Sequence, residues 1–327
     1  MRRRDLILGL TSAIVLPSVY SCVRNAGDKI GNKELNPIAL PKGFQYPNGI
    51  TRSSDGTVYV GSVTSGDILQ VSLKDKDKSE IKPFFQGNQD IFAVATVKLD
   101  EARGILWGTS PDVLRNAGKQ HRVFAIDVNS SKVLNIITIP DDGFGNDIAL
   151  DLNGGVYVTD SVKPRILYLP PGATQFETWV ENQLFRTRGR FGLSGITHRE
   201  DGVLFVTMYS DGRLFKVNQN RTVEEIELPR KIDGSDAIQL ADDGSLFMIE
   251  GGIESGNGGL LQLEGLETDT KRKSGFKILA SGMNLPVNLT VSDKEILLTE
   301  SLFRHRLVPG KENEIPNQFF IRRFSLS

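Results

Sequence analysis

A short pattern recurs six times along the chain, and it limits the possible folds more than any other feature of the sequence. Each copy has a small or polar residue, an apolar alternation, an acidic or glycine-bearing turn and a second apolar alternation. The copies begin at Asn48, Val94, Asn146, Ser194, Asp236 and Asn288. Two runs of period 2 around a turn of this kind indicate a β-hairpin. The body of the chain is therefore predicted to be built from six similar β units.

Most copies are followed by further apolar runs, such as residues 66–71, 212–217 and 224–228. Four short antiparallel strands in a unit of about 40–50 residues are the signature of a propeller blade. We therefore predict an all-β fold over residues 37–327, a six-bladed β-propeller of four-stranded antiparallel blades. Residues 319–324 are expected to form a strand of the last blade, and residues 37–44 its outer strand, which closes the ring. A pair of β-sandwiches is the competing architecture, but it would not require so regular a repeat.

The first 21 residues are predicted to be an export signal, because three arginines precede an apolar run that is too short to span a bilayer. Arg3-Arg4-Asp5-Leu6-Ile7 resembles a twin-arginine signal, and Val19-Tyr20-Ser21-Cys22 resembles a bacterial lipobox. We expect lipidation at Cys22, with residues 22–36 as a polar tether. A cleaved signal with an incidental Cys22 and an uncleaved anchor are the alternatives. The expected location is the periplasm or cell envelope, with membrane contact only through the lipid.

Composition excludes several classes of function. The chain has 39 Lys and Arg, 40 Asp and Glu and a formal net charge of -1, which argues against electrostatic binding of nucleic acid. A single cysteine excludes an intramolecular disulfide framework and a cysteine-rich metal site. The expected partner is a small molecule or a protein at the axial mouth, and the protein is expected to be a monomer.

The topology of a blade predicts which loops share that mouth. In an antiparallel blade, the starts of the inner strands and the connections from second to third strands lie on one face. The longest insertions fall there, at residues 110–120, 182–193, 250–258 and 301–317. Insertions confined to one face of a repeat array usually mark the binding face.

Polar residues at the expected starts of the inner strands should ring the axis at this mouth. They are Asn48, Asn146, Ser194, Asp236 and Asn288, and the ends of the second strands add Asp160, Glu250 and Glu300. Carboxylate and amide oxygens suit a hard cation, although such residues also bond their own backbone at turns. Arginines on the expected mouth loops are candidates to attract an anion, or are simply solvated. They are Arg186, Arg188, Arg190 and Arg304.

The repeated form Asn-Gly-Ile or Asn-Asp-Ile, then Asp-Gly, then Val-Tyr-Val-Thr-Asp resembles the regucalcin/gluconolactonase superfamily, which is luciferin-regenerating-enzyme-like and has an NHL-like blade pattern. The resemblance implies one divalent metal at the axial mouth, calcium first and zinc or manganese as alternatives, and hydrolysis of sugar lactones. By motif, Asn146 and Asp236 match two of the family's metal ligands. Asn48 stands where the family has a glutamate, and residues 92–96 lack the family's Arg-x-Asn substrate motif.

Two functions follow from these observations. The first is an exported propeller whose polar axial pocket binds a small ligand or partner without catalysis. The alternative is a divalent-metal-dependent lactonase or esterase, in which a metal on Asn48, Asn146 and Asp236 polarises the carbonyl. Asp236 would then be a ligand or the general base. The substituted glutamate and the missing Arg-x-Asn motif favour the first function.

Overall fold

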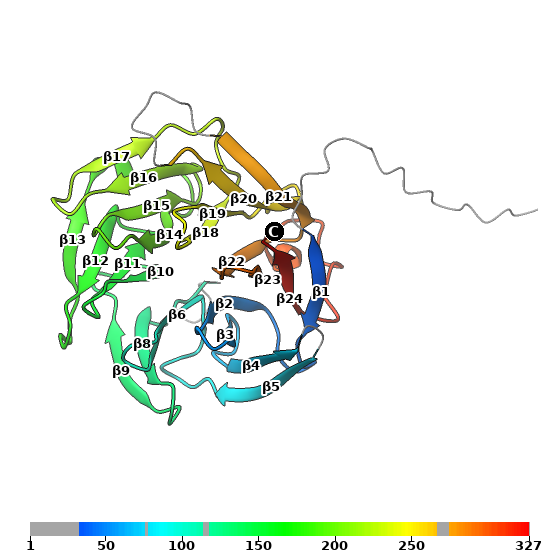
Figure 1. Ribbon diagram of the computed structural model, residues 1–327. Helices are drawn as coiled ribbons and strands as arrows, with labels where there is room; N and C mark the ends of the chain where they lie inside the picture. Colours follow the sequence, from blue (N-terminus) through cyan, green and yellow to red (C-terminus); the bar gives the residue numbers. More distant parts are fainter. Residues whose placement is uncertain (1–32, 76–77, 114–117, 267–274, 327) are drawn as a thin grey trace, which may run out of the picture. The chain divides into compact units, whose positions relative to one another are not determined.

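The computed structural model describes residues 33–75, 78–113, 118–266 and 275–326. It shows six four-stranded antiparallel sheets around a common axis, as predicted (Figure 1). Residues 1–21, predicted as a signal, and Cys22 lie outside the described part of the chain. No helix among the described residues is long and apolar enough to cross a membrane.

Five blades are each continuous in sequence and run outward from the axis. Blade 1 contains β2 (Pro47–Arg52), β3 (Thr57–Ser62), β4 (Ile68–Asp75) and β5 (Lys78–Phe85). Blade 2 contains β6 (Thr96–Asp100), β7 (Ile105–Ser110), β8 (Arg122–Asp127) and β9 (Val133–Thr138). Blade 3 contains β10 (Gly145–Leu150), β11 (Val156–Asp160), β12 (Arg165–Leu169) and β13 (Glu177–Glu181). Blade 4 contains β14 (Leu193–His198), β15 (Leu204–Met208), β16 (Arg213–Val217) and β17 (Val223–Ile226). Blade 5 contains β18 (Ser235–Leu240), β19 (Leu246–Glu250), β20 (Gly258–Glu264) and β21 (Gly275–Met283).

Blade 6 joins the two ends of the described chain. Its inner strands are β22 (Pro286–Val291), β23 (Glu295–Glu300) and β24 (Phe320–Ser325), and its outer strand is β1 (Glu34–Ala39). β1 pairs antiparallel with β24 and sets Ile38 opposite Ile321. The ring is thus closed by a sheet, as predicted, although β1 begins inside the stretch that the sequence suggested as a tether. Two short helices, η1 (Gln183–Phe185) and α1 (Arg304–Leu307), lie in the connections.

The core lies between the blades. Six clusters of buried apolar residues are present, and each joins two neighbouring blades. A second strand such as β11 therefore packs on both faces, and all five of its residues are buried. Burial on both faces explains why these strands are almost continuously apolar in sequence.

The innermost strands are irregular where they begin. The pairing register shifts near the start of the inner strand in five blades, for example between Gly145 and Ile148 in blade 3. A bulge adds a residue to one strand and changes the direction of its side chains. Two consecutive residues of an inner strand can therefore face the axis.

A repeated hydrogen bond links blades at this level. In four blades a threonine of the second strand donates its hydroxyl to a backbone carbonyl at the start of the next inner strand. The bonds run from Thr109 to Asn146 (3.0 Å), Thr159 to Ser194 (2.5 Å), Thr207 to Asp236 (3.2 Å) and Thr299 to Asn48 (2.5 Å). The bonds fix the positions of the inner-strand starts relative to one another.

Replacing Thr159 with valine should lower the free energy of unfolding by about 1–3 kcal/mol, because two buried backbone groups lose their partner. The Thr159 hydroxyl donates to the Ser194 carbonyl and accepts the Asp147 amide N–H (3.0 Å). Urea denaturation measures the effect. Thr138→Val, on the exposed edge of β9, is the matched control and should change stability little. Equal stabilities for the two variants would contradict the proposed role of the threonine.

Candidate functional site

A cavity of about 410 Å³ lies where the inner strands begin, and every blade contributes to it. Its polar lining comes chiefly from inner strands and includes Asn48, Asn146, Asp147, Asp236 and Asn288. Its apolar wall comes from the connecting loops and includes Phe144, Phe191, Tyr209, Ile253, Leu285, Phe303 and Leu307. The aromatic rings form a continuous row, since Phe191 lies 5.6 Å from Phe144 and 5.9 Å from Tyr209 between ring centroids.

The predicted ring of polar residues is only partly present. Asn48, Asn146, Asp236 and Asn288 line the cavity, whereas Ser194 is fully buried and donates its hydroxyl to Asp236 Oδ1 at 3.1 Å. The strand pairings show that Asn288 is equivalent to Asp147 rather than to Asn146. Its blade instead has an apolar residue, Val287, at the position of Asn146.

Blade 2 also departs from the predicted ring. The residue that reaches the cavity is Ala95, not Val94. Val94 is fully buried and packs where a side chain on Gly61 would be, since a Cβ there would lie 2.1 Å from Val94 Cγ1. The small side chain of Ala95 leaves space beside the axis.

The three acidic residues expected at the rim, Asp160, Glu250 and Glu300, do not line the cavity. Each instead accepts a backbone N–H from the loop that leads into its own inner strand. The donors are Phe144 for Asp160 (2.9 Å), Asp233 for Glu250 (2.9 Å) and Asn284 for Glu300 (2.7 Å). Each carboxylate also pairs with an arginine, Arg165, Arg230 or Arg322. These acids therefore hold the loops that carry part of the cavity wall.

The four arginines have different surroundings. Arg190 lies at the exposed edge of the cavity, with its guanidinium 5.1 Å from the Phe191 ring centroid. Arg186 and Arg188 are exposed and do not line the cavity. Arg304 is buried, donates to the carbonyls of Ile253 and Glu254, and pairs with Glu314. It stabilises a loop of the wall and is not free to hold an anion.

Two acidic side chains at the bottom of the cavity differ in their bonding. Asp147 is buried and accepts three hydrogen bonds, from Thr96 Oγ1 (2.6 Å) and from the amides of Ile148 and Ile196. Among the described residues, the Asp236 carboxylate receives a side-chain bond from Ser194 alone. Burial raises the pKa of Asp236 to about 7, and the charge of Asp147 adds to this effect. Tyr209 has its pKa raised by burial and by the acidic residues nearby.

The donor set fits a hard cation better than zinc. Asp236 offers a carboxylate, and the amide of Asn48 makes no hydrogen bond within the described residues. Asn146 donates its amide N–H to Ser161, which leaves its oxygen available. Oxygen donors suit calcium, which takes 6–8 of them, but only one here is a free carboxylate. No group of three or more His, Cys, Asp or Glu residues suited to a metal occurs in the described ranges.

Asp147 and the aromatic wall were not predicted from the sequence. Asp147 follows Asn146 directly, and strict alternation along a strand would point it away from the axis. The aromatic residues lie in irregular loops, where no periodicity marks them. The threonines that link the blades could have been recognised in the sequence, because Thr occupies the same place in the repeat at positions 109, 159, 207 and 299.

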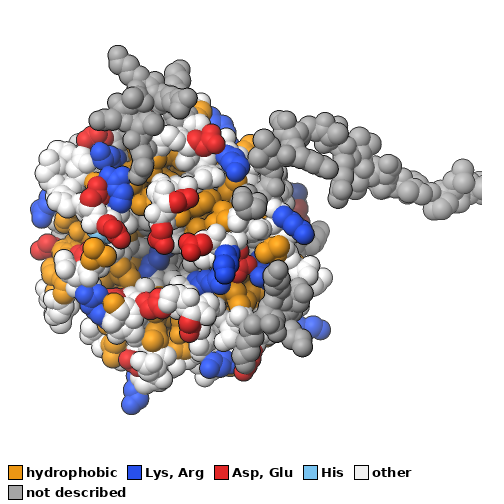
Figure 2. All heavy atoms as spheres, in the orientation of Figure 1, with side chains coloured by type: hydrophobic (Ala, Val, Ile, Leu, Met, Phe, Trp, Pro, Cys, Tyr) orange, Lys and Arg blue, Asp and Glu red, His pale blue; other side chains and the backbone are white. Residues whose placement is uncertain are grey.

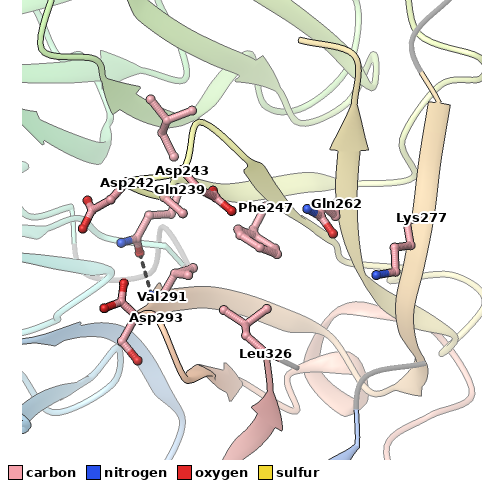
Figure 3. Close-up of a pocket in the computed structure, with 12 residues that line it drawn as sticks. Gln239, Asp242, Asp243, Phe247, Gln262, Lys277, Val291, Asp293 and Leu326 are labelled. Carbon is pink, nitrogen blue, oxygen red and sulfur yellow. Dashed lines mark hydrogen bonds between the residues drawn. The ribbon is translucent and has the colours of Figure 1, made fainter. Parts of the chain in front are cut away.

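A second depression lies between blades 5 and 6, beside the short turns that follow β18 and β22 (Figure 3). It has a volume of about 420 Å³ and is bordered by Asp242, Asp243 and Asp293. Gln239 accepts the Val291 amide there (3.2 Å) and so links the two inner strands. On the face in view, Figure 2 shows both acidic and basic side chains around a central hollow. Exposed carboxylates in turns are well solvated, so this depression is a suitable control surface.

These features define a six-bladed β-propeller with a cavity at one end of its axis. The chain matches no family model, and no curated protein matches it. Solved structures of the same fold include a streptogramin B lyase (19% identity, 81% of this chain and 80% of that chain, TM-score 0.60). A protein assigned as a gluconolactonase has 12% identity over 89% of this chain and 92% of its own, with a TM-score of 0.60. A luciferin-regenerating enzyme has 8% identity over 88% and 95%, with a TM-score of 0.56. Identities this low show the shared fold alone.

Replacing Asp236 with asparagine should stabilise the protein at neutral and higher pH. The pKa of this carboxyl is about 7 in the folded protein and has a reference value of 3.8. The folded state therefore binds the proton more tightly, and the contribution of Asp236 to stability falls as pH rises from about 4 to 7. The variant should gain at most about 4 kcal/mol at pH 8, less where solvent reaches the carboxylate.

Thermal unfolding of both proteins at several pH values tests this expectation. The difference in melting temperature should shrink toward acidic pH, where Asp236 is protonated in both states. Asp242→Asn, in an exposed turn, is the control and should show no such pH dependence. A variant that is less stable than the parent protein at pH 8 would contradict the assignment.

Proposed function

We propose that this protein binds a small organic ligand in the axial cavity without catalysing a reaction. The observation that carries the proposal is the pairing of a polar inner end with a wall of aromatic and aliphatic residues. Sites for small molecules are typically concave, about 300–1,000 Å³ in volume, and mainly apolar with a few placed polar groups. The predicted export signal would place such a binding protein in the cell envelope. A protein partner inserting one side chain into the mouth would use the same lining.

The side chains in the cavity support binding more than nucleophilic catalysis. No histidine lies among the described residues that line it. Ser194 contacts Asp236, but its side chain is fully buried behind that residue. A nucleophile must reach the substrate and have a base within hydrogen-bond distance. The described lining offers no such pair.

Filling the cavity should abolish binding. Ala95→Met places a larger apolar side chain beside the axis and removes no polar group. The neutral fluorophore N-phenyl-1-naphthylamine should show enhanced emission with the parent protein and lose most of that enhancement with this variant. Ala241→Met, in the depression between blades 5 and 6, is the matched control and should bind as the parent does. Equal enhancement for both variants would overturn the proposal.

A metal-dependent lactonase or esterase is the second candidate. One observation favours it, namely that Asn48, Asn146 and Asp236 all reach the same cavity. Bound calcium would supply Lewis-acid polarisation of a substrate carbonyl. With a pKa of about 7, Asp236 could hold or release a proton at neutral pH. The aromatic wall would position an apolar portion of the substrate.

Calcium should raise the melting temperature of the purified mature chain if this second candidate is correct. Asp236→Asn should remove the calcium-dependent shift, whereas Asp242→Asn should retain it. A panel of lactones and esters then tests turnover, with Asp236→Asn as the inactive reference. No shift with millimolar calcium, zinc or manganese would exclude the candidate.

A further inference from the structure

We propose that the ligand of the axial cavity is an organic cation, with an ammonium group attached to an aromatic or aliphatic body. This inference rests on the proposed binding function and adds the chemical class of the ligand. It combines the charge of the lining, the bonding of Asp236 and the position of the aromatic rings.

The lining is strongly acidic on one side. Its charged residues are Asp147, Asp233, Asp236, Glu254 and Arg190. Four carboxylates thus face one guanidinium, and all five residues belong to blades 3, 4 and 5 or the loops that join them. Arg304 lies behind this wall and is occupied by Glu314 and two carbonyls. An anionic ligand would be repelled from the inner end of the cavity, whereas a cation would be attracted to it.

Asp236 provides the acceptor for the charged group. Its carboxylate receives one side-chain hydrogen bond, from Ser194, and no arginine or lysine pairs with it among the described residues. Asp236 is partly buried. A partly buried carboxylate without a counter-charge is unfavourable, and an ion pair or further hydrogen bonds would offset that cost. An ammonium group supplies both, because it carries a charge and donates N–H bonds.

The aromatic row extends from the same side of the cavity. Phe144 precedes β10, Phe191 precedes β14 and Tyr209 follows β15, so all three rings lie beside the acidic residues of blades 3 to 5. The face of an aromatic ring attracts a cation at about 6 Å or less. Arg190 already occupies such a position over Phe191. The opposite half of the cavity has no charged residue among those described. It is mainly apolar, with Ala95, Val113, Leu285, Val287, Phe303 and Leu307, together with Asn48, Asn288 and Ser301. This half suits the hydrocarbon body of a ligand. A bare metal ion would leave these apolar side chains without a contact.

Three probes of one shape test the charge preference. They are 1-naphthylmethylamine, 1-naphthylmethanol and the carboxylate 1-naphthaleneacetate, titrated into the full mature chain by calorimetry at pH 8 with EDTA present. The amine, as its ammonium ion, should bind at least about tenfold more tightly than the alcohol, and the acetate more weakly than either. Asp236→Asn should remove most of the preference for the amine over the alcohol. Asp242→Asn, on the control surface, should bind all three as the parent does.

The outcomes separate this inference from the function on which it rests. Equal binding of the amine and the alcohol would overturn the cation inference and leave the binding function intact. Failure of all three probes, together with failure of the neutral fluorophore, would overturn both. A preference for the ammonium that survives in Asp236→Asn would overturn the assignment of this residue as its partner.

Discussion

The hydrogen bond from a second-strand threonine to the start of the next inner strand is the interaction on which the axial cavity depends. Blades of a propeller pack through side chains, and sheet packing alone tolerates small sliding. The cavity requires the blades to be positioned more precisely than this, because its lining comes from six separate blades. The hydroxyls of Thr109, Thr159, Thr207 and Thr299 fix four of the six junctions. At the other two, blade 1 has Gly61, which Val94 covers, and blade 5 has the fully buried Ile249. An apolar contact takes the place of the threonine at both junctions, and at the first of them the Val94 amide also donates to the Ser62 carbonyl (2.9 Å).

A second set of contacts holds the loops at the same end of the ring. Asp160, Glu250 and Glu300 each bond a backbone amide of the loop that enters the inner strand, and each is neutralised by an arginine. The charges of Asp160, Glu250 and Glu300 are therefore neutralised in structural ion pairs. Asp236 has no such partner among the described residues. This difference explains why one carboxyl of this end of the ring has a pKa of about 7. The fold tolerates one destabilising carboxylate because the other carboxylates at this end of the ring have amide and arginine partners.

The sequence predicted the architecture well because blade repeats, short turns and ring closure depend on local patterns. Strand alternation and turn residues sufficed to place Asn48, Asn146 and Asp236 at one end of the axis. The sequence pattern did not predict the features of the site that depend on tertiary contacts. A bulge at the start of β10 turns both Asn146 and Asp147 toward the cavity, and the alignment of Asn288 with Asp147 follows from pairing with β23. The role of Asp160 depends on Arg165 and on the Phe144 amide, neither of which a strand pattern specifies. The aromatic wall lies in irregular loops, whose course the repeat does not determine.

The solved structures that share this fold have names that refer to different activities, so the fold alone does not specify a reaction. What distinguishes this chain is the uneven distribution of polarity around the axis. Every charged residue in the described lining comes from blades 3 to 5, and blades 6, 1 and 2 contribute apolar side chains together with Asn48, Asn288 and Ser301. A symmetric ring of oxygens would favour a centred ion. An acidic half that faces an uncharged, mainly apolar half would instead orient an elongated molecule across the axis, with its charged end toward Asp236.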